Sequence, residues 1–225
     1  MPILALDTSS SVAVAVLDDA GATLAARAAD ESRRHAELLA PMVAAVLDEA
    51  RVDRRALTAV AVGTGPAPFT GLRVGLVTAR TLALALGIPA WGVPSTDALA
   101  AAAARGSAAG TRILVVTDAR RHEVYWAAYE ATGEGGFVAC GGPDIAAPGD
   151  LREAATGALV VGRGAALHAA TLRLADEPAL RDPDPAELGR LALVRAAAGE
   201  PLPTEPLYLR RPDAVPPAGA KRVLA

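Results

Sequence analysis

An aspartate and two hydroxyl residues near the N-terminus are the first side chains able to do chemistry. Asp7, Thr8 and Ser9 follow the apolar run Ile3–Leu6 and precede the β-branched run Val12–Leu17. An acid at a strand end followed by small hydroxyl residues can hold a magnesium nucleotide, because backbone N–H groups face phosphate and the carboxylate orders metal-bound water. An ordinary turn stabilised by Asp and Ser side chains has the same pattern. Taken alone, the pattern favours the turn.

A loop rich in glycine and proline, Gly63–Gly75, resembles a phosphate-binding loop in outline. It lacks the Gly-Lys-Ser/Thr ending of a Walker A sequence and does not match Gly-x-Gly-x-x-Gly. Pro66 and Pro68 also remove two backbone donors that a phosphate would need. We therefore expect a stiff loop that presents Phe69 and starts a helix, with Thr70 as its N-cap.

The remaining titratable residues form no recognisable catalytic set. His35 and Glu37 are two positions apart and do not face each other on a helix, and a zinc helix would need a second histidine where Leu39 stands. The stretch Asp118–Tyr125 holds several titratable residues but no nucleophile with a base at a useful spacing. Gly162-Arg163-Gly164 indicates a tight strand-to-helix turn.

Composition narrows the class of protein. The chain has 225 residues, a net charge of −3 and one cysteine, Cys140, which excludes a disulfide framework and a cysteine-based zinc site. The charge lacks the basic excess typical of proteins that bind nucleic acid alone. The N-terminus does not resemble a signal peptide, and the apolar stretch Val74–Ile88 carries Arg80 and is too short to span a bilayer. We expect a cytoplasmic protein that does not enter the membrane.

Hydrophobic periodicity predicts an α/β chain whose second half repeats the first. Strands are expected at 3–7, 12–17, 23–29, 57–63 and 89–93, with helices at 35–50, 71–86 and 95–105. After the small, flexible stretch Gly106–Gly110, a strand, a polar turn and a second strand follow again at 113–130. We predict an N-terminal domain over 1–105, a smaller C-terminal domain over 106–211 and a flexible tail over 212–225.

Two helices carry more apolar surface than one sheet face would cover, which predicts a helix–helix interface with a partner. The helix 71–86 is apolar nearly all round, and glycines four apart would let a second helix approach closely. The expected interface residues are Leu39, Met42, Val43, Val46, Gly71, Leu72, Gly75, Leu76 and Ala79. Alternatively, the C-terminal half covers this surface.

Five segments in order resemble the TsaB (YeaZ) family of the bacterial threonylcarbamoyladenosine pathway. They are Ile3–Ser9, His35–Leu39, Gly63–Gly75, Asp118–Ala127 and Tyr208–Arg210, so the resemblance spans about residues 3–211. The most specific is Gly-Pro-x-x-Phe-Thr-Gly-x-Arg-x-Gly at Gly65–Gly75. One departure is visible, because Ala67-Pro68 replaces the family's usual Gly-Ser and makes the loop stiffer.

The resemblance implies an actin-like, sugar-kinase-like fold of two similar α/β domains. It implies a scaffold and activator without catalysis of its own, acting with a TsaD-like transferase and a TsaE-like ATPase. ATP or ADP and metal belong to those partners, the chain alone forms a homodimer, and tRNA is contacted only through the complex. Any nucleotide site at Asp7, Thr8 and Ser9 would be vestigial. The residues agree, since Ala119, Arg120 and Arg121 would crowd a phosphate where a nucleotide-binding turn would carry glycines.

Three other functions remain open at this point. A small-molecule kinase of the same fold would use Asp7 and Asp118 around Mg-ATP. A homodimeric binding module would need no enzyme partner. A peptidase-like role is disfavoured because the metal-helix histidine is missing.

Overall fold

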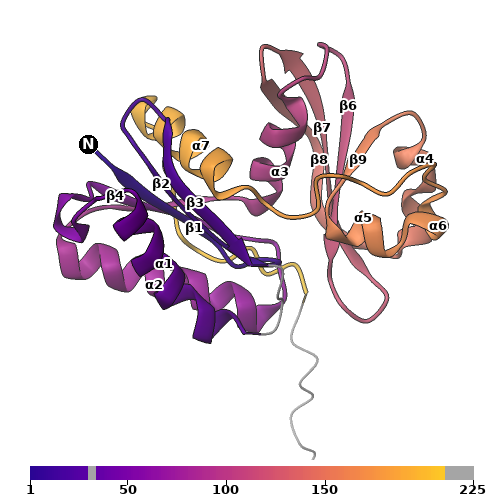
Figure 1. Ribbon diagram of the computed structural model, residues 1–225. Helices are drawn as coiled ribbons and strands as arrows, with labels where there is room; N and C mark the ends of the chain where they lie inside the picture. Colours follow the sequence, from indigo (N-terminus) through magenta and orange to yellow (C-terminus); the bar gives the residue numbers. More distant parts are fainter. Residues whose placement is uncertain (30–33, 211–225) are drawn as a thin grey trace, which may run out of the picture.

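The computed structural model describes residues 1–29 and 34–210, which build two β-sheets with helices on both faces of each (Figure 1). The predicted tail at 212–225 lies outside these residues. The first sheet has the order β3-β2-β1-β4-β5 and the second the order β8-β7-β6-β9. The strands are β1 Ile3–Asp7, β2 Val12–Leu17, β3 Thr23–Ala29, β4 Ala59–Gly63, β5 Ala90–Val93, β6 Arg112–Asp118, β7 Val124–Gly133, β8 Gly136–Ala146 and β9 Leu159–Val161.

The second sheet repeats the plan of the first, as the sequence predicts. β1 pairs with β2 antiparallel and with β4 parallel, and β6 pairs with β7 antiparallel and with β9 parallel. A parallel pair needs a crossover, which β2, β3 and a helix supply in the first half. The main helices are α1 His35–Glu49, α2 Phe69–Leu86, α3 Ser95–Ala104 and α7 Pro185–Ala197, and the short ones are α4 Arg152–Ala155, α5 Arg163–Leu167 and α6 Ala169–Leu172.

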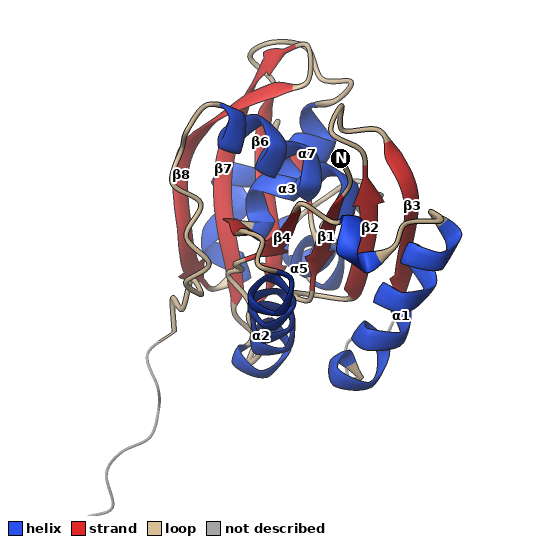
Figure 2. Cartoon of the chain, turned by 90° about the vertical axis from the view of Figure 1, so that its left-hand side faces the viewer, coloured by secondary structure: helices blue, strands red, loops and turns tan. Residues whose placement is uncertain are grey.

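Alternation along β1 divides the core of the first half into two layers. Leu4 and Leu6 face α1 and α2, whereas Ile3 and Ala5 face α7 on the opposite side of the sheet (Figures 1 and 2). All five residues of β1 are buried. The sheet is therefore covered on both faces, and the end of β1 at Asp7 is held inside the fold.

Helix α3 joins the two halves. Its Ala98 packs in the core layer beneath the first sheet, and Leu99 packs with Ile113 and Tyr129 of the second. Eight of its ten residues are buried, which its run of small alanine side chains permits. The other face of the second sheet is covered by α4, α5 and α6.

The domain boundaries at 105 and 211 stay predictions, and the packing of one C-terminal helix bears on them. Helix α7 lies in the C-terminal stretch of the sequence, yet it packs on β1 and β2 of the first sheet. The chain thus crosses between the halves twice, once between α3 and β6 and once between α6 and α7 (Figure 1).

Two local expectations, both about helix α2, differ from the structure. Helix α2 begins at Phe69 with Pro68 as N-cap, not after Thr70, because Pro68 already has the extended conformation that precedes a helix. By length and composition alone, α2 could also cross a membrane, but the core helix of a folded protein passes the same test.

Candidate functional site

The carboxylate of Asp7 lies at the centre of the candidate site and is held entirely by protein groups. Its Oδ1 accepts hydrogen bonds from the backbone N–H and the hydroxyl of Ser9, at 2.7 and 2.6 Å. Its Oδ2 accepts one from the hydroxyl of Ser95 at 2.6 Å, and that hydroxyl accepts one from the N–H of Gly65 at 3.1 Å. Asp7 therefore ties β1 to the start of α3 and to the loop after β4.

Burial governs the chemistry of this carboxylate. Asp7 is 1% exposed. Burial raises its pKa, and the hydrogen bonds from Ser9 and Ser95 offset only part of that effect. A Cβ on Gly63 would overlap Oδ2, so the loop after β4 can lie this close only with glycine at position 63. The arrangement does not fit a magnesium nucleotide held by Asp7, because the carboxylate is enclosed and does not line the adjacent cleft.

Thr8 connects the same turn to helix α2. Its hydroxyl donates to the carbonyl of Gly71 at 2.9 Å and accepts from the N–H of Gly75 at 3.1 Å. A Cβ on Gly75 would overlap that hydroxyl oxygen. Gly71 and Gly75 thus allow α2 to approach Thr8 closely within the chain. The prediction that these glycines admit a helix of a partner is therefore corrected.

A cleft of about 240 Å³ opens beside this turn, between the two halves. The β1–β2 turn and the start of α2 form one wall, and the β6–β7 turn forms the other. Nε2 of His35 donates to the carbonyl of Ser10 at 3.1 Å and closes one end. The lining residues are Thr8, Ser9, Ser10, His35, Pro68, Thr70, Gly71, Asp118 and Arg120.

The β6–β7 turn has an unusual backbone. Arg120, Arg121 and His122 all have positive φ, at 63°, 54° and 63°. Side chains disfavour this region, which glycine adopts freely. Asp118 stabilises the turn by accepting from the N–H of Arg120 at 2.7 Å and by pairing with its guanidinium at 3.3 Å. Arg120 consequently lines the cleft where glycine would leave open space.

A second cluster joins motif residues that are far apart in sequence. The rings of Phe69 and Tyr208 stack with centroids 5.3 Å apart, and the guanidinium of Arg73 lies 3.6 Å from the centre of the Phe69 ring. Nε of Arg73 donates to the Tyr208 hydroxyl at 2.9 Å. In the sequence these residues belong to two separate motifs, Gly65–Gly75 and Tyr208–Arg210, and nothing local indicates that the motifs meet.

Tyr208 belongs to the C-terminal strap, residues 200–210, which returns along the first half after α7 (Figure 1). The N–H of Gly92 on β5 donates to Leu202, and the N–H of Leu207 donates to Thr64. Arg80 of α2 donates to the hydroxyl and carbonyl of Thr204, each at 2.8 Å. The strap ends with an ion pair between Arg210 and Glu123, beside the start of β7.

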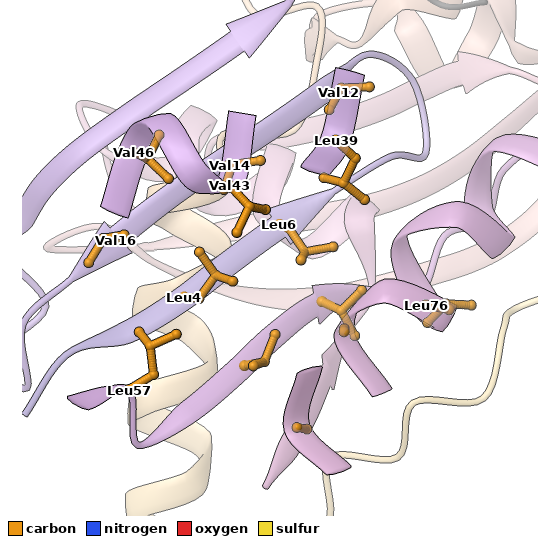
Figure 3. Close-up of a cluster of buried hydrophobic side chains, with 14 of the residues drawn as sticks. Leu4, Leu6, Val12, Val14, Val16, Leu39, Val43, Val46, Leu57 and Leu76 are labelled. Carbon is orange, nitrogen blue, oxygen red and sulfur yellow. The ribbon is translucent and has the colours of Figure 1, made fainter. Parts of the chain in front are cut away.

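Most of the expected interface residues are core residues, which corrects that prediction. Buried inside the first half are Leu39, Val43, Val46, Leu72, Gly75, Leu76 and Ala79, and partly buried are Met42 and Gly71. Figure 3 shows Leu39, Val43, Val46 and Leu76 among the side chains of the first sheet. The apolar stripes of α1 and α2 cover that sheet, so these residues are not on the surface.

The outward face of α2 carries a different apolar stripe. Phe69, Val77 and Leu84 are 53%, 61% and 85% exposed. At 100° per residue these positions fall on one side of the helix, together with Arg73 and Arg80. This stripe was not predicted from the sequence, because hydrophobic side chains all round a helix do not reveal which side the sheet covers.

A cavity of about 920 Å³ is lined by residues 152–161 and 172–180, at the outer edge of the second sheet and away from the motif residues. Within residues 1–29 and 34–210, no three His, Cys, Asp or Glu side chains are grouped so that they could hold a metal ion.

The chain matches one family model and several known proteins. The model described as TsaD, tRNA N6-adenosine threonylcarbamoyltransferase, matches residues 28–151. An uncharacterised protein of Mycobacterium tuberculosis (strain H37Rv) is 41% identical over 95% of this chain and 94% of its own length. A Mycobacterium leprae protein is 40% identical over 95% of this chain, which spans 56% of that relative. The tRNA threonylcarbamoyladenosine biosynthesis protein TsaB of Escherichia coli (strain K12) is 38% identical over 58% of this chain and 55% of its own.

A solved structure matches nearly the whole chain. YeaZ from Pseudomonas aeruginosa has a TM-score of 0.73 and 33% identity, covering 92% of this chain and 99% of that one. A second structure from the same organism, described as similar to peptidase YeaZ, has a TM-score of 0.76 and 33% identity over 93% and 99% of the two chains. The expected actin-like α/β fold with two sheets is confirmed.

Proposed function

The chain belongs to the TsaB (YeaZ) family, and from that premise we propose that it is a non-catalytic subunit in tRNA threonylcarbamoyladenosine biosynthesis, which binds and activates a TsaD-like transferase. The named relatives carry this pathway in their names, and the match to the TsaD family model is what a paralogue of the transferase would give. The proposal separates two roles within one fold: the partner transfers the threonylcarbamoyl group, and this chain supports it.

The observation that carries the non-catalytic role is the enclosure of Asp7. A carboxylate that orders metal-bound water must face the ligand, whereas this one is 1% exposed and accepts hydrogen bonds from Ser9 and Ser95. Arg120 supports the same conclusion, because its side chain lines the cleft on the wall opposite the β1–β2 turn, where it would crowd a phosphate. Nucleotide and metal would then be bound by the partner subunits, and the Asp7–Ser9 turn would have a structural role here.

The proposed partner surface is the outward face of α2. Phe69, Val77 and Leu84 expose apolar side chains in one stripe, and Arg73 and Arg80 lie between them on the same side of the helix. A stripe of this kind on a helix suits the apolar face of another helix. We propose that a TsaD-like subunit covers it in the complex and that a second copy of this chain covers it otherwise. A TsaE-like ATPase completes the complex in this proposal.

The net negative charge of this chain supports a complex in which the partner subunits make most of the contacts with tRNA. With a net charge of −3, the chain lacks the positive field that drives binding to phosphate backbones. We propose that it meets tRNA only as part of the complex and that it works in the cytoplasm, where tRNA modification takes place.

Reconstitution tests this function directly. We expect threonylcarbamoyl transfer to tRNA by the TsaD-like and TsaE-like subunits from the same cell to depend on adding this chain, which alone should turn over neither ATP nor tRNA. ATP turnover that follows the amount of this chain and is lost in Asp7→Ala would favour the small-molecule kinase instead. Failure to co-purify with the TsaD-like subunit, with an intact dimer, would favour the homodimeric binding module.

A further inference from the structure

Asp182 joins the two halves beside the cleft, because its hydrogen-bond partner Ser10 is one of the residues that line the cleft. Its Oδ1 accepts from the hydroxyl of Ser10 at 2.5 Å and from Nε of Arg163 at 2.9 Å. Its Oδ2 accepts from Nη2 of Arg163 at 2.6 Å. One carboxylate thus receives three hydrogen bonds, two of them from a guanidinium that binds both of its oxygens.

The three residues come from three different parts of the fold. Ser10 lies in the β1–β2 turn of the first half, and Arg163 begins α5 in the second half. Asp182 lies in the segment that crosses from α6 to α7, the orange trace between the halves in Figure 1. The N–H of Gly162 donates to Leu180 at 2.7 Å, which fixes the start of this crossing to the second half.

The turn Gly162-Arg163-Gly164 is built to present the guanidinium at this place. Gly162 has a φ of 109°, and a Cβ there would overlap the carbonyl oxygen of Val116. A Cβ on Gly164 would likewise overlap the backbone of Thr117. Both glycines let the turn lie against the end of β6, so the position of Arg163 is set by packed backbone.

Ser10 and Arg163 together have the chemistry of an oxoanion receptor. A guanidinium binds carboxylate and phosphate with the same paired geometry, and a hydroxyl donor completes either arrangement. The side chains of Asp182 and Arg163 are 23% and 25% exposed, so the pair is mostly shielded from water. The same donors would accept a phosphate group in place of the carboxylate.

We propose that Ser10 and Arg163 form an oxoanion-binding site for phosphate-type groups, and that Asp182 occupies this site from within the chain. The carboxylate does what a bound phosphate would do between the two halves, and the halves are held together here without a ligand. Separation of the halves at this point would pivot on α3, whose Ala98 and Leu99 pack toward the first and the second half. Because the internal carboxylate is tethered, free phosphate does not displace it in the wild-type chain.

A distance measurement across the cleft, with inorganic phosphate as the probe, tests this assignment. Cys140 on β8 is exposed and supplies one spin-label position, and Asp48→Cys on exposed α1 surface supplies the other. We expect a narrow distance distribution in the otherwise wild-type chain, insensitive to phosphate. Asp182→Ala should broaden it and shift it to longer distances, and phosphate in the millimolar range at constant ionic strength should restore it.

Two further variants make the outcome decisive. Asp176→Ala removes an exposed acid from the same crossing segment and should behave as the wild type. Asp182→Ala combined with Arg163→Ala should stay broad at every phosphate concentration. An unchanged distribution in Asp182→Ala overturns the proposal, and so does a broadened one that phosphate does not narrow. If Asp182→Ala does not fold, Asp182→Ser, which also removes the carboxylate and leaves the space beside Arg163 open, is read in the same way.

Discussion

The hydroxyl of Thr8 and the backbone of Gly75 meet inside the first half, where the N–H of Gly75 donates to Thr8 Oγ1 at 3.1 Å. The same oxygen donates to the carbonyl of Gly71 at 2.9 Å, so it bridges two residues one turn apart on α2. This contact fixes α2 against the end of β1. It also changes how substitutions on this helix should be interpreted, because position 75 faces the core.

Gly75→Ala should destabilise the fold. Alanine gains up to about 1 kcal/mol of helix propensity over glycine. Its Cβ would overlap Thr8 Oγ1, and overpacking of this kind costs about 1–3 kcal/mol. We expect a net loss in the free energy of unfolding, measured with urea. Gly149→Ala is the control, since its Cβ would make ordinary contact with Arg152 at 3.8 Å. A variant as stable as the wild type would show that α2 can move away from Thr8.

The sequence predicts much of the fold because its signals are local. Alternation, turn residues and the repeat of the strand–turn–strand pattern place β1, β2, β6 and β7 close to their observed bounds. The site was harder to predict because its contacts are distant in sequence. Ser95 lies 88 residues from Asp7, and Tyr208 lies 135 residues from Arg73. No local pattern indicates that these pairs meet, nor which side of α2 faces the sheet.

The buried carboxylate of Asp7 should give the wild type a characteristic pH dependence. Burial raises its pKa in the folded state above the value of about 3.9 expected in the unfolded chain. The folded state therefore binds the proton more tightly, so the contribution of Asp7 to stability is fully present below about pH 4 and is lost as pH rises through the folded pKa. Asp7→Asn does not titrate and keeps an acceptor for Ser9.

We accordingly expect the unfolding free energy of the wild type to fall relative to that of Asp7→Asn as the pH rises from 4 to 7. Urea unfolding at several pH values measures it, and Asp176→Asn corrects for removing a surface charge. A difference that moves toward the wild type as pH rises would mean that the hydrogen bonds from Ser9 and Ser95 outweigh burial.

Tyr208 should anchor the C-terminal strap to α2. Tyr208→Phe keeps the ring stacked on Phe69 and loses the hydrogen bond from Arg73, so it should cost about 0.5–1.5 kcal/mol. Tyr208→Ala also loses the ring contact and should cost about 0.5–1.5 kcal/mol more. Both are measured by urea unfolding. Equal stability of the two variants would contradict a role for the ring stack, and two unchanged variants would contradict anchoring altogether.

The outward face of α2 gives the sharpest test of the partner surface. Val77 and Leu84 are 61% and 85% exposed in the single chain, so glutamate at either position has room and should leave the fold intact. In an assembled interface the same glutamate would lose its hydration, and the neighbouring arginines of α2, Arg73 and Arg80, are already bound to Tyr208 and Thr204 of the strap. Burying the glutamate costs several kcal/mol, which corresponds to two or more decades in affinity.

We therefore expect Val77→Glu and Leu84→Glu to unfold like the wild type, to become monomeric by light scattering and to bind a TsaD-like subunit at least about 100-fold more weakly. Val194→Glu is the matched control, because Val194 is 68% exposed on α7, on the opposite side of the first sheet. If all three variants keep the wild-type mass and affinity, the stripe on α2 is ordinary surface. If Val194→Glu alone separates the partners, the contact lies on α7, on the opposite face of the first sheet, and the assignment of the interface to α2 is wrong.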